Sequence, residues 1–404
     1  MRISTNQFYD ASIRSITDQQ SALLKVSQQL SAQRTLLNPA DDPVAAGREV
    51  ALDASLSLSN QMVKNQADVR SQLQQTENYI QHASDVLQSF QSRMVQGGSG
   101  ILAANERQSI ATDLSALRDE LLGVANTQDE NGNYVFAGYK RDTRPFVQTA
   151  DGVVYQGDGG VRQSQIGPDR FIDTNFSGTY LFDNIPGGKG GLTVSAGDGN
   201  MGSLLLNGIS TTDRDAWQAA SAAGPFTVTF GADGAYSVAD GAGEEVSTGT
   251  LAAGAQSLTV NGATVTFTGT PADGDTLSIG ASGNASIFDS LDKAIAALQM
   301  PDSPQESVRR ANALFSAGLD IDAGFSRALE ARTAIGTRIN EIDAATNADT
   351  ARGDAVQDEI SRVVGSDIST QTELTGELAK RTYTVQAAQL TYTRVSQLSI
   401  FDYL

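Results

Sequence analysis

The residues whose chemistry could support catalysis or metal binding are few in this chain of 404 residues. There is one histidine, His82, and there is no cysteine. Histidine is a common general base, and cysteine supplies both a nucleophile and a thiolate metal ligand. Most acid–base, nucleophilic and zinc-binding schemes therefore lack a component. His82 stands in a stretch with helical periodicity and is better explained as a surface residue.

Acidic and glycine-rich segments offer the remaining chemistry. Asp41 and Asp42 could bind a cation, but an Asp directly before Pro43 is typical of a helix start, and adjacent side chains point apart. The Asp-Gly-Asp sequence at 273–275 lacks the spacing and closing Glu of an EF-hand, and the glycines at 187–191 match no P-loop or dinucleotide fingerprint. We predict no metal, no cofactor and no enzymatic activity. A hydrolase with a carboxylate pair in the central region stays open as an alternative.

Charge and hydropathy narrow the classes of partner. The net charge is -19, from 28 basic and 47 acidic residues, and without a basic stripe we expect no nucleic-acid partner. Residues 1–8 lack the apolar run of a cleaved signal, and no stretch approaches the roughly 20 apolar residues of a membrane span, so we expect no membrane insertion. The absence of cysteine suits a cytosolic protein or one exported unfolded, and composition does not separate the two.

The distribution of glycine divides the chain into three parts. Of 39 glycines, 7 lie in 1–140, 26 in 141–284 and 6 in 285–404. Glycine is disfavoured in helices and common in turns. We therefore predict an α+β multidomain protein, with a long α-helical coiled-coil core formed by the N- and C-terminal arms and a central β-rich inserted domain.

The two ends of the chain have thin apolar stripes. The N-terminal stripe in 8–37 and the C-terminal stripe in 371–404 each repeat at steps of three, four or seven. One row is too little to hold an isolated helix, so we expect these arms to be disordered in the monomer and to order against other helices. We assign the stripes to packing between subunits; the alternative is packing within the subunit alone. The assigned residues are Ile16, Leu23, Leu30, Leu37, Leu374, Leu378, Val385, Tyr392, Val395, Leu398 and Phe401.

Local signals predict where the helices begin and end. Pro39 and Pro43 break the first helix, and Asp42 with Pro43 starts a second over 43–96. A third helix is expected near Asn105 with Gln108 in the capping-box position.

Two further helices are predicted after the central region. One covers 285–300, and the Ser-Pro-Gln-Glu sequence at 303–306 starts the next. Its apolar seam continues to Ile342, and the polar stretch 343–355 is expected to be looser.

Short β-prone runs between turn residues indicate the strands. They occur at 134–138, 153–157 and 226–230. Two more, within 257–267, predict a hairpin about the Asn-Gly pair at 261–262. A compact antiparallel β domain is the expected product.

Three segments resemble a known family. They are the start at 1–5 with the Leu-Leu-Asn-Pro-Ala-Asp-Asp-Pro-Val-Ala-Ala sequence at 36–46, the Gly-Asn-Tyr-Val-Phe-Ala-Gly-Tyr-Lys sequence at 132–140 with Arg-Pro-Phe at 144–146, and the end at 392–404. Together they resemble the flagellin superfamily and, within it, the hook-filament junction proteins.

The resemblance covers about 1–180 and 285–404 and implies a secreted structural subunit of the bacterial flagellum. The implied inter-layer joint consists of Pro39, Asp41, Asp42 and Pro43. The implied domains are 1–40 with 366–404 as terminal coiled-coil arms of the inner tube layer, 41–180 with 285–365 as a helical core with a β-hairpin, and 181–284 as an outward-facing β-rich domain.

The implied function is an adaptor that joins hook to filament as its terminal helices fold during polymerisation. The implied partners are other copies of the chain, a neighbouring hook-associated protein on the hook side, filament flagellin on the distal side, and a cytoplasmic type III export chaperone on the C-terminal arm. Its implied location is extracellular, at the junction, without a cleaved signal peptide. Two alternatives stay open: a flagellin that forms the filament itself, and a helical-stalk adhesin with the β domain as binding module.

Overall fold

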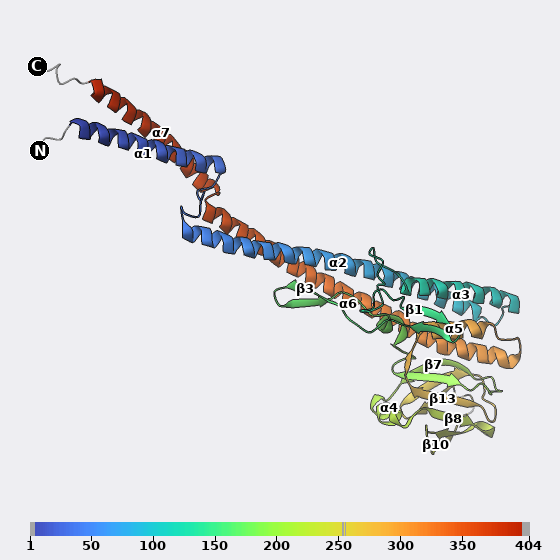
Figure 1. Ribbon diagram of the computed structural model, residues 1–404. Helices are drawn as coiled ribbons and strands as arrows, with labels where there is room; N and C mark the ends of the chain where they lie inside the picture. The colour runs from blue at the N-terminus through green and yellow to red at the C-terminus, as the bar shows by residue number, and fades with distance from the viewer. Residues whose placement is uncertain (1–4, 253, 255, 398–404) are drawn as a thin grey trace, which may run out of the picture. The chain divides into compact units, whose positions relative to one another are not determined.

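The computed structural model describes residues 5–252, 254 and 256–397, which divide into two compact units. The first unit comprises Met1–Gln66 and Asp343–Leu404, and the second comprises Ala67–Ile342. Helices α2 and α6 contribute residues to both. The main helices are α1 (Thr5–Ala32), α2 (Pro43–Gly97), α3 (Ala104–Ala125), α4 (Arg214–Ala220), α5 (Ile287–Leu298), α6 (Pro304–Val364) and α7 (Ile368–Gln397) (Figure 1).

Several helix boundaries agree with the local signals. Helix α2 begins at Pro43 because Asp42 Oδ1 accepts hydrogen bonds from the N–H groups of Val44 and Ala45, both at 3.0 Å. Helix α6 begins at Pro304, and Ser303 Oγ accepts the N–H of Glu306 at 3.1 Å. The helix predicted over 285–300 is α5. These predictions are confirmed.

Two predictions about helices are wrong. Helix α3 begins at Ala104, as predicted near Asn105, but its capping-box residue is Glu106 and not Gln108, because the carboxylate of Glu106 accepts the N–H of Ala103 at 2.9 Å. The stretch 343–355, expected to be loose, is regular helix within α6. Its polar character does not loosen it, because Asp349 is 4% exposed and accepts a hydrogen bond from Gln66 Nε2 at 2.7 Å.

One predicted strand of the second unit is absent. The run 134–138, predicted as a strand, forms turns instead. Phe136 and Ala137 are 0% exposed, and the Phe136 ring contacts Phe182 edge-on at 5.6 Å between centroids, so packing overrides the β propensity.

Three small two-stranded sheets accompany the helices of the second unit. They are β1 (Phe146–Thr149) with β2 (Gly152–Tyr155), β3 (Gln163–Gly167) with β4 (Arg170–Asp173), and β5 (Ile185–Pro186) with β14 (Asn284–Ala285).

The remaining strands form two larger antiparallel sheets. The order β10-β9-β8-β13-β6 builds the first from Glu245–Thr250, Ala235–Ala239, Phe226–Phe230, Thr276–Ala281 and Leu192–Ala196. The order β11-β12-β7 builds the second from Ser257–Val260, Ala263–Thr268 and Leu205–Thr211. The predicted hairpin at 261–262 joins β11 to β12, with φ of 47° at Asn261 and 83° at Gly262.

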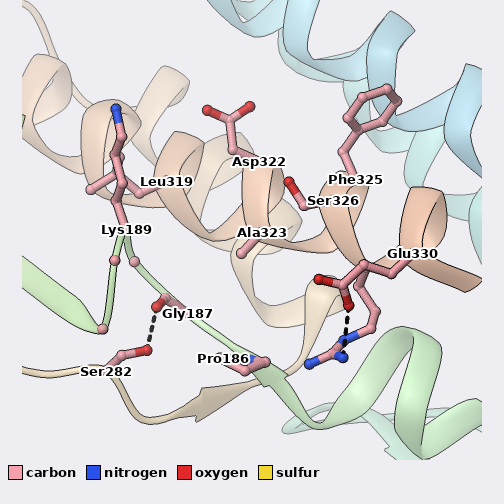
Figure 2. A pocket seen from close by; sticks show the side chains of 14 residues that line it. Pro186, Gly187, Lys189, Ser282, Leu319, Asp322, Ala323, Phe325, Ser326 and Glu330 are labelled. Atoms are coloured by element: carbon pink, nitrogen blue, oxygen red, sulfur yellow. Dashed lines mark hydrogen bonds and ion pairs between the residues drawn. The ribbon is translucent and has the colours of Figure 1, made fainter.

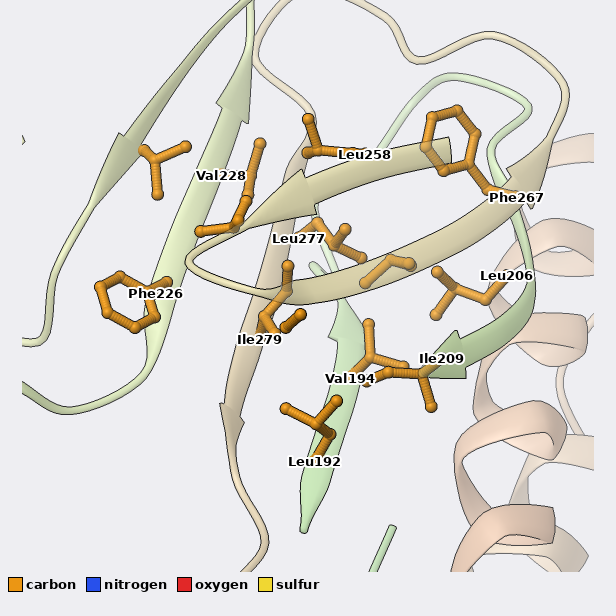
Figure 3. Packing of buried hydrophobic residues seen from close by; sticks show 14 of the residues in the cluster. Leu192, Val194, Leu206, Ile209, Phe226, Val228, Leu258, Phe267, Leu277 and Ile279 are labelled. Atoms are coloured by element: carbon orange, nitrogen blue, oxygen red, sulfur yellow. The ribbon is translucent and has the colours of Figure 1, made fainter. Parts of the chain in front are cut away.

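One apolar core lies between the two larger sheets, which we call the sandwich (residues 192–281). Alternation along β8 places Phe226, Val228 and Phe230 inside and Thr227 and Thr229 outside. Figure 3 shows side chains from β6, β7, β8 and β13 converging on this core. Both sheets are therefore needed to bury one cluster.

Candidate subunit-packing surface of the terminal helices

Helices α1 and α7 lie side by side and run antiparallel (Figure 1). Near the start of α1 the ring of Tyr9 meets the edge of Tyr392, near the end of α7, at 6.1 Å between centroids. After α1 ends, the N–H groups of Thr35 and Leu36 donate to the carbonyl of Val364 at 2.8 and 3.3 Å. The pairing thus joins the first helix of the chain to the last.

The described residues of the predicted stripe are covered to different extents. Leu374 and Val385 are buried at 9% and 7% exposure. Leu37 lies after the end of α1 and is half-buried in the linker. The side chain of Val395 is not described, and Leu398 and Phe401 lie outside the described residues. The remaining members are half-buried: Ile16, Leu23, Leu30, Leu378 and Tyr392.

Val26, at 6% exposure, is a buried residue of α1 that the heptad did not predict. It stands three residues after Leu23 and four before Leu30, on the same helix face. A pattern of alternating three- and four-residue steps predicts Val26, whereas a pattern of seven-residue steps alone does not.

Two pairs of apolar residues, which we call together the exposed row, are exposed to solvent. Ile13 and Leu24 on α1 are 48% and 62% exposed, and Tyr383 and Leu390 on α7 are 74% and 55% exposed. The α7 pair is seven residues apart and the α1 pair eleven apart, so each pair shares one helix face. Sequence reasoning missed this row because it followed only one stripe on each helix.

A groove of about 370 Å³ opens between the two helices. Most of its side chains are small, which leaves room for a side chain from outside the pair. The lining residues are Ala11, Ser12, Ser15, Ile16, Ala388, Thr391 and Tyr392.

The adjacent carboxylates of the linker between α1 and α2 serve different helices. Asp42 caps α2, whereas Asp41 accepts Lys25 Nζ of α1 at 2.7 Å and the N–H of Asn38 at 3.1 Å. The hydrogen bonds from Lys25 and Asn38 hold the pKa of Asp41 below its ordinary value. Pro39 and Pro43 are exposed in or beside this linker.

The linker between α6 and α7 contacts the first linker. Gly365 has φ of 69°, and a Cβ there would lie 2.1 Å from Thr35 Oγ1, so glycine is required. Asp367 then caps α7: its carboxylate accepts the Ser369 and Thr370 hydroxyls, both at 2.6 Å, and the N–H of Thr370 at 3.0 Å. These bonds, the Ser369 hydroxyl first, hold the pKa of Asp367 well below its ordinary value.

Other residues with possible chemistry have structural roles. His82 lies 3.0 Å from Glu120 on the helix surface. Asp275 accepts N–H groups of Met201 and Ala272 at 2.7 and 2.8 Å, which closes turns in the sandwich. Among the described residues, no three His, Asp or Glu side chains cluster closely enough to hold a metal ion. In the same part of the chain, no helix has the length and apolarity to cross a membrane.

The glycine-rich loop at 187–191 borders a cleft of about 450 Å³ against α6. Figure 2 shows Lys189 and Ser282 on one side and Asp322 and Phe325 on the other. The Ser282 hydroxyl donates to the carbonyl of Gly187.

Comparisons with known proteins place this architecture. The model of the bacterial flagellin N-terminal helical region matches residues 3–141. Flagellar hook-associated protein 3 of Salmonella typhimurium is 34% identical over 185 residues, which are 46% of this chain and 58% of that protein. The match thus spans less than two thirds of this relative's length.

Solved structures extend the likeness over more of the chain. Superposition on the crystal structure of FlgL from Xanthomonas campestris gives a TM-score of 0.70 at 30% identity, covering 77% of this chain and 99% of that one. The flagellar junction protein FlgL from Legionella pneumophila, at 24% identity, shares the fold, with a TM-score of 0.70 over 78% of this chain and 99% of its own. The chain therefore belongs to the flagellar hook-associated protein 3 (FlgL) family, within the flagellin superfamily.

Proposed function

We propose that this chain is a structural subunit that joins the flagellar hook to the filament, and that it is not an enzyme. The names of its relatives, a hook-associated protein and a junction protein, support the location. The observation that carries the mechanism is the incomplete burial of the terminal helices.

The energetics of these helices favour assembly between copies. Helix α1 has 28 residues and α7 has 30, yet among their described side chains only Val26, Leu374 and Val385 are buried apolar ones. Burial of one large apolar side chain contributes about 1.5–3 kcal/mol, and ordering one residue's backbone costs about 1–2 kcal/mol. Burial within one chain therefore offsets little of the ordering entropy. Contacts with neighbouring copies would shift that balance.

We assign the predicted stripe and the exposed row different roles. The stripe, which the sequence assigns to packing between subunits, would instead join α1 to α7 within one copy, the alternative stated above. The row Ile13, Leu24, Tyr383 and Leu390 would contact neighbouring copies. The linker residues Pro39, Asp41, Asp42 and Pro43 would then form the joint between the terminal arms (1–40, 366–404) and the helical core (41–180, 285–365). Residues 181–284 would face outward.

The proposed partners follow from this role. They are other copies of the chain, a hook-associated protein on the hook side, filament flagellin on the distal side and a type III export chaperone on the C-terminal arm. The protein would reach the flagellum by type III export.

Hydrogen exchange on dilute and assembled protein tests the mechanism. We expect amides of α1 and α7 to exchange far faster than those of the sandwich in the monomer, and to become protected on assembly. Full protection of both helices in a dilute monomer would contradict coupled folding.

A variant with Tyr383→Ser and Leu390→Ser tests the exposed row. We expect export to continue but swimming to be lost when this variant replaces the chain in its own bacterium. The matched control changes two exposed glutamines of the same helix, Gln386→Ala and Gln389→Ala, and should keep swimming.

The match to the flagellin N-terminal region favours a second candidate, a flagellin that forms the filament itself. Seeded growth separates the two. A flagellin should extend into long fibres from purified monomer, whereas a junction subunit should stop after a short layer.

A further inference from the structure

The sandwich is connected to the rest of the second unit by a narrow neck, formed by residues 185–191 and 282–285. Its strands β5 and β14 pair through only two residues each, and the N–H of Gly187 donates to the carbonyl of Gly283 at 2.9 Å. Glycines occupy 187, 188, 190, 191 and 283. A neck of this composition can change its backbone angles with little steric resistance.

A buried amide fixes the sandwich against α6. Asn312 is 6% exposed; its Nδ2 donates to the carbonyl of Leu204 at 2.9 Å, and its Oδ1 accepts the N–H of Leu206 at 2.8 Å. The side chain thus takes the place of a neighbouring strand at the start of β7. A buried amide is stable only when both its donor and its acceptor are used, so it selects one orientation of the two parts.

The same face of α6 makes the other contacts. Phe315 and Leu319, three and seven residues after Asn312, pack against the sandwich core. Asp320 accepts the N–H of Gly188 in the neck at 2.7 Å. Phe315 and Leu319 are only partly buried, so their apolar contacts stabilise the docked position less than the contacts of a closed core would.

Space for movement is present next to the neck. The cleft between the loop 187–191 and α6 in Figure 2 is lined by Leu319, Ala323 and Ser326 on the helix side. It lies beside the Asp320 contact and leaves the neck uncovered on that side.

We propose that the sandwich is a hinged module, held on α6 by Asn312 and Asp320, that swings about the neck when these contacts open. Asn312 and Asp320 are positioning residues in this device. The inference does not depend on the proposed function.

Distance measurements between two spin labels test the hinge. Because the chain has no cysteine, the exposed residues Thr248 on β10 and Asn340 on α6 can be labelled selectively as Thr248→Cys and Asn340→Cys. The unaltered chain should give one narrow distance. Asn312→Ala removes two hydrogen bonds and should raise the undocked-to-docked ratio by roughly tenfold, seen as a second population.

Two controls separate hinge opening from unfolding. Asn347→Ala, at an exposed position of the same helix, should leave the distance unchanged. Trp217, the only tryptophan, lies in the sandwich core at 5% exposure, so its fluorescence reports whether the sandwich is folded. Asn312→Ala should keep the native Trp217 emission.

A second variant decides the case in which Asn312→Ala unfolds the sandwich. Asp320→Ala removes the acceptor for the neck, together with a longer hydrogen bond of 3.4 Å from the Ser290 hydroxyl of α5, and should also broaden the distance distribution. If Asn312→Ala folds and still gives a single narrow distance, the hinge is wrong. If Asn312→Ala unfolds, a single narrow distance in a folded Asp320→Ala protein would overturn the hinge instead.

Discussion

The sandwich and the α1–α7 pair show two ways of using apolar residues. In the sandwich, Phe226, Phe230 and Phe267 are each 1% exposed, and Val228 is fully buried. Among the described side chains of the helix pair the best-covered apolar one, Val26, is 6% exposed, and Tyr383 is 74% exposed. The sandwich completes its core within one chain, whereas the helix pair does not. The contrast shows that one chain can combine a region with a closed apolar core and a region whose apolar side chains stay partly exposed.

The polar groups of the two regions differ in the same way. In α1 and α7 many hydroxyls donate to the carbonyl one turn earlier in their own helix, as Thr17 does to Ile13 at 3.0 Å and Thr382 to Leu378 at 2.7 Å. In the sandwich, hydroxyls bond between strands, as Thr259 does with Thr264 at 2.8 Å. Cross-strand bonds support the tertiary fold, whereas bonds within one helix leave its surface available.

The largest expected effect is a loss of stability in the sandwich. Phe267→Ala should lower its free energy of unfolding by about 3–5 kcal/mol, because a fully enclosed ring leaves a cavity. Denaturant unfolding followed by Trp217 fluorescence measures this loss. Thr229→Ala, on the outer face of β8, is the control and should change stability by less than about 0.5 kcal/mol.

A smaller effect is expected where the linkers meet. Gly365→Ala should destabilise the first unit by about 1–3 kcal/mol, since φ of 69° and the contact with Thr35 oppose any Cβ. Gly376→Ala is the matched change within α7, where nothing lies within 4 Å of the new methyl group, and should stabilise the helix by about 0.5–1 kcal/mol. Thermal melting of the helical signal compares them; equal effects would refute the proposed strain.

Truncation in the helix pair should have a still smaller effect on the monomer. Val385→Ala should lower the stability of the α1–α7 pair by about 1 kcal/mol and leave Trp217 fluorescence unaltered. Hydrogen exchange in α7 measures the change. A loss comparable with that of Phe267→Ala would abolish the contrast between the two regions.

The smallest expected effect is a dependence on pH confined to the linkers. Asp41 and Asp367 have folded-state pKa values below the ordinary 3.8. A depressed pKa contributes stability that is present above the unfolded value and is lost as pH falls through the folded one. Both linkers should therefore loosen only below about pH 4. Carboxyl NMR titration measures the two pKa values, and Asp367→Asn should remove its share of the dependence.

The sequence predicted features that depend on a few neighbouring residues. The start of α2 at Asp42 and Pro43, the start of α6 at Ser303 and the turn at Asn261 each follow from side-chain chemistry within four positions. The predictions were wrong where two local hydrogen bonds compete or where packing against distant residues determines the backbone conformation. Glu106 rather than Gln108 caps α3, and Phe136 is buried in a turn that its propensity does not indicate.

The burial of some stripe residues could be predicted for the same reason. A heptad identifies residues such as Leu374 and Val385 that can face a helix, and both are buried. It does not specify which helix they face or how many are present. The exposure of Tyr383 and Leu390 depends on the antiparallel placement of α1, which follows from contacts between residues more than 300 positions apart.

The hydrogen bonds between the first linker and the end of α6 determine which substitutions these positions can accept. The N–H groups of Thr35 and Leu36 and the Thr35 hydroxyl all converge on one main-chain oxygen, the carbonyl of Val364. A main-chain acceptor is present whatever side chain the residue carries, so position 364 can drift among apolar residues of similar size. Saturation mutagenesis should accordingly find fewer permitted residues at Thr35 and Gly365 than at position 364, where several apolar residues of similar size should be accepted.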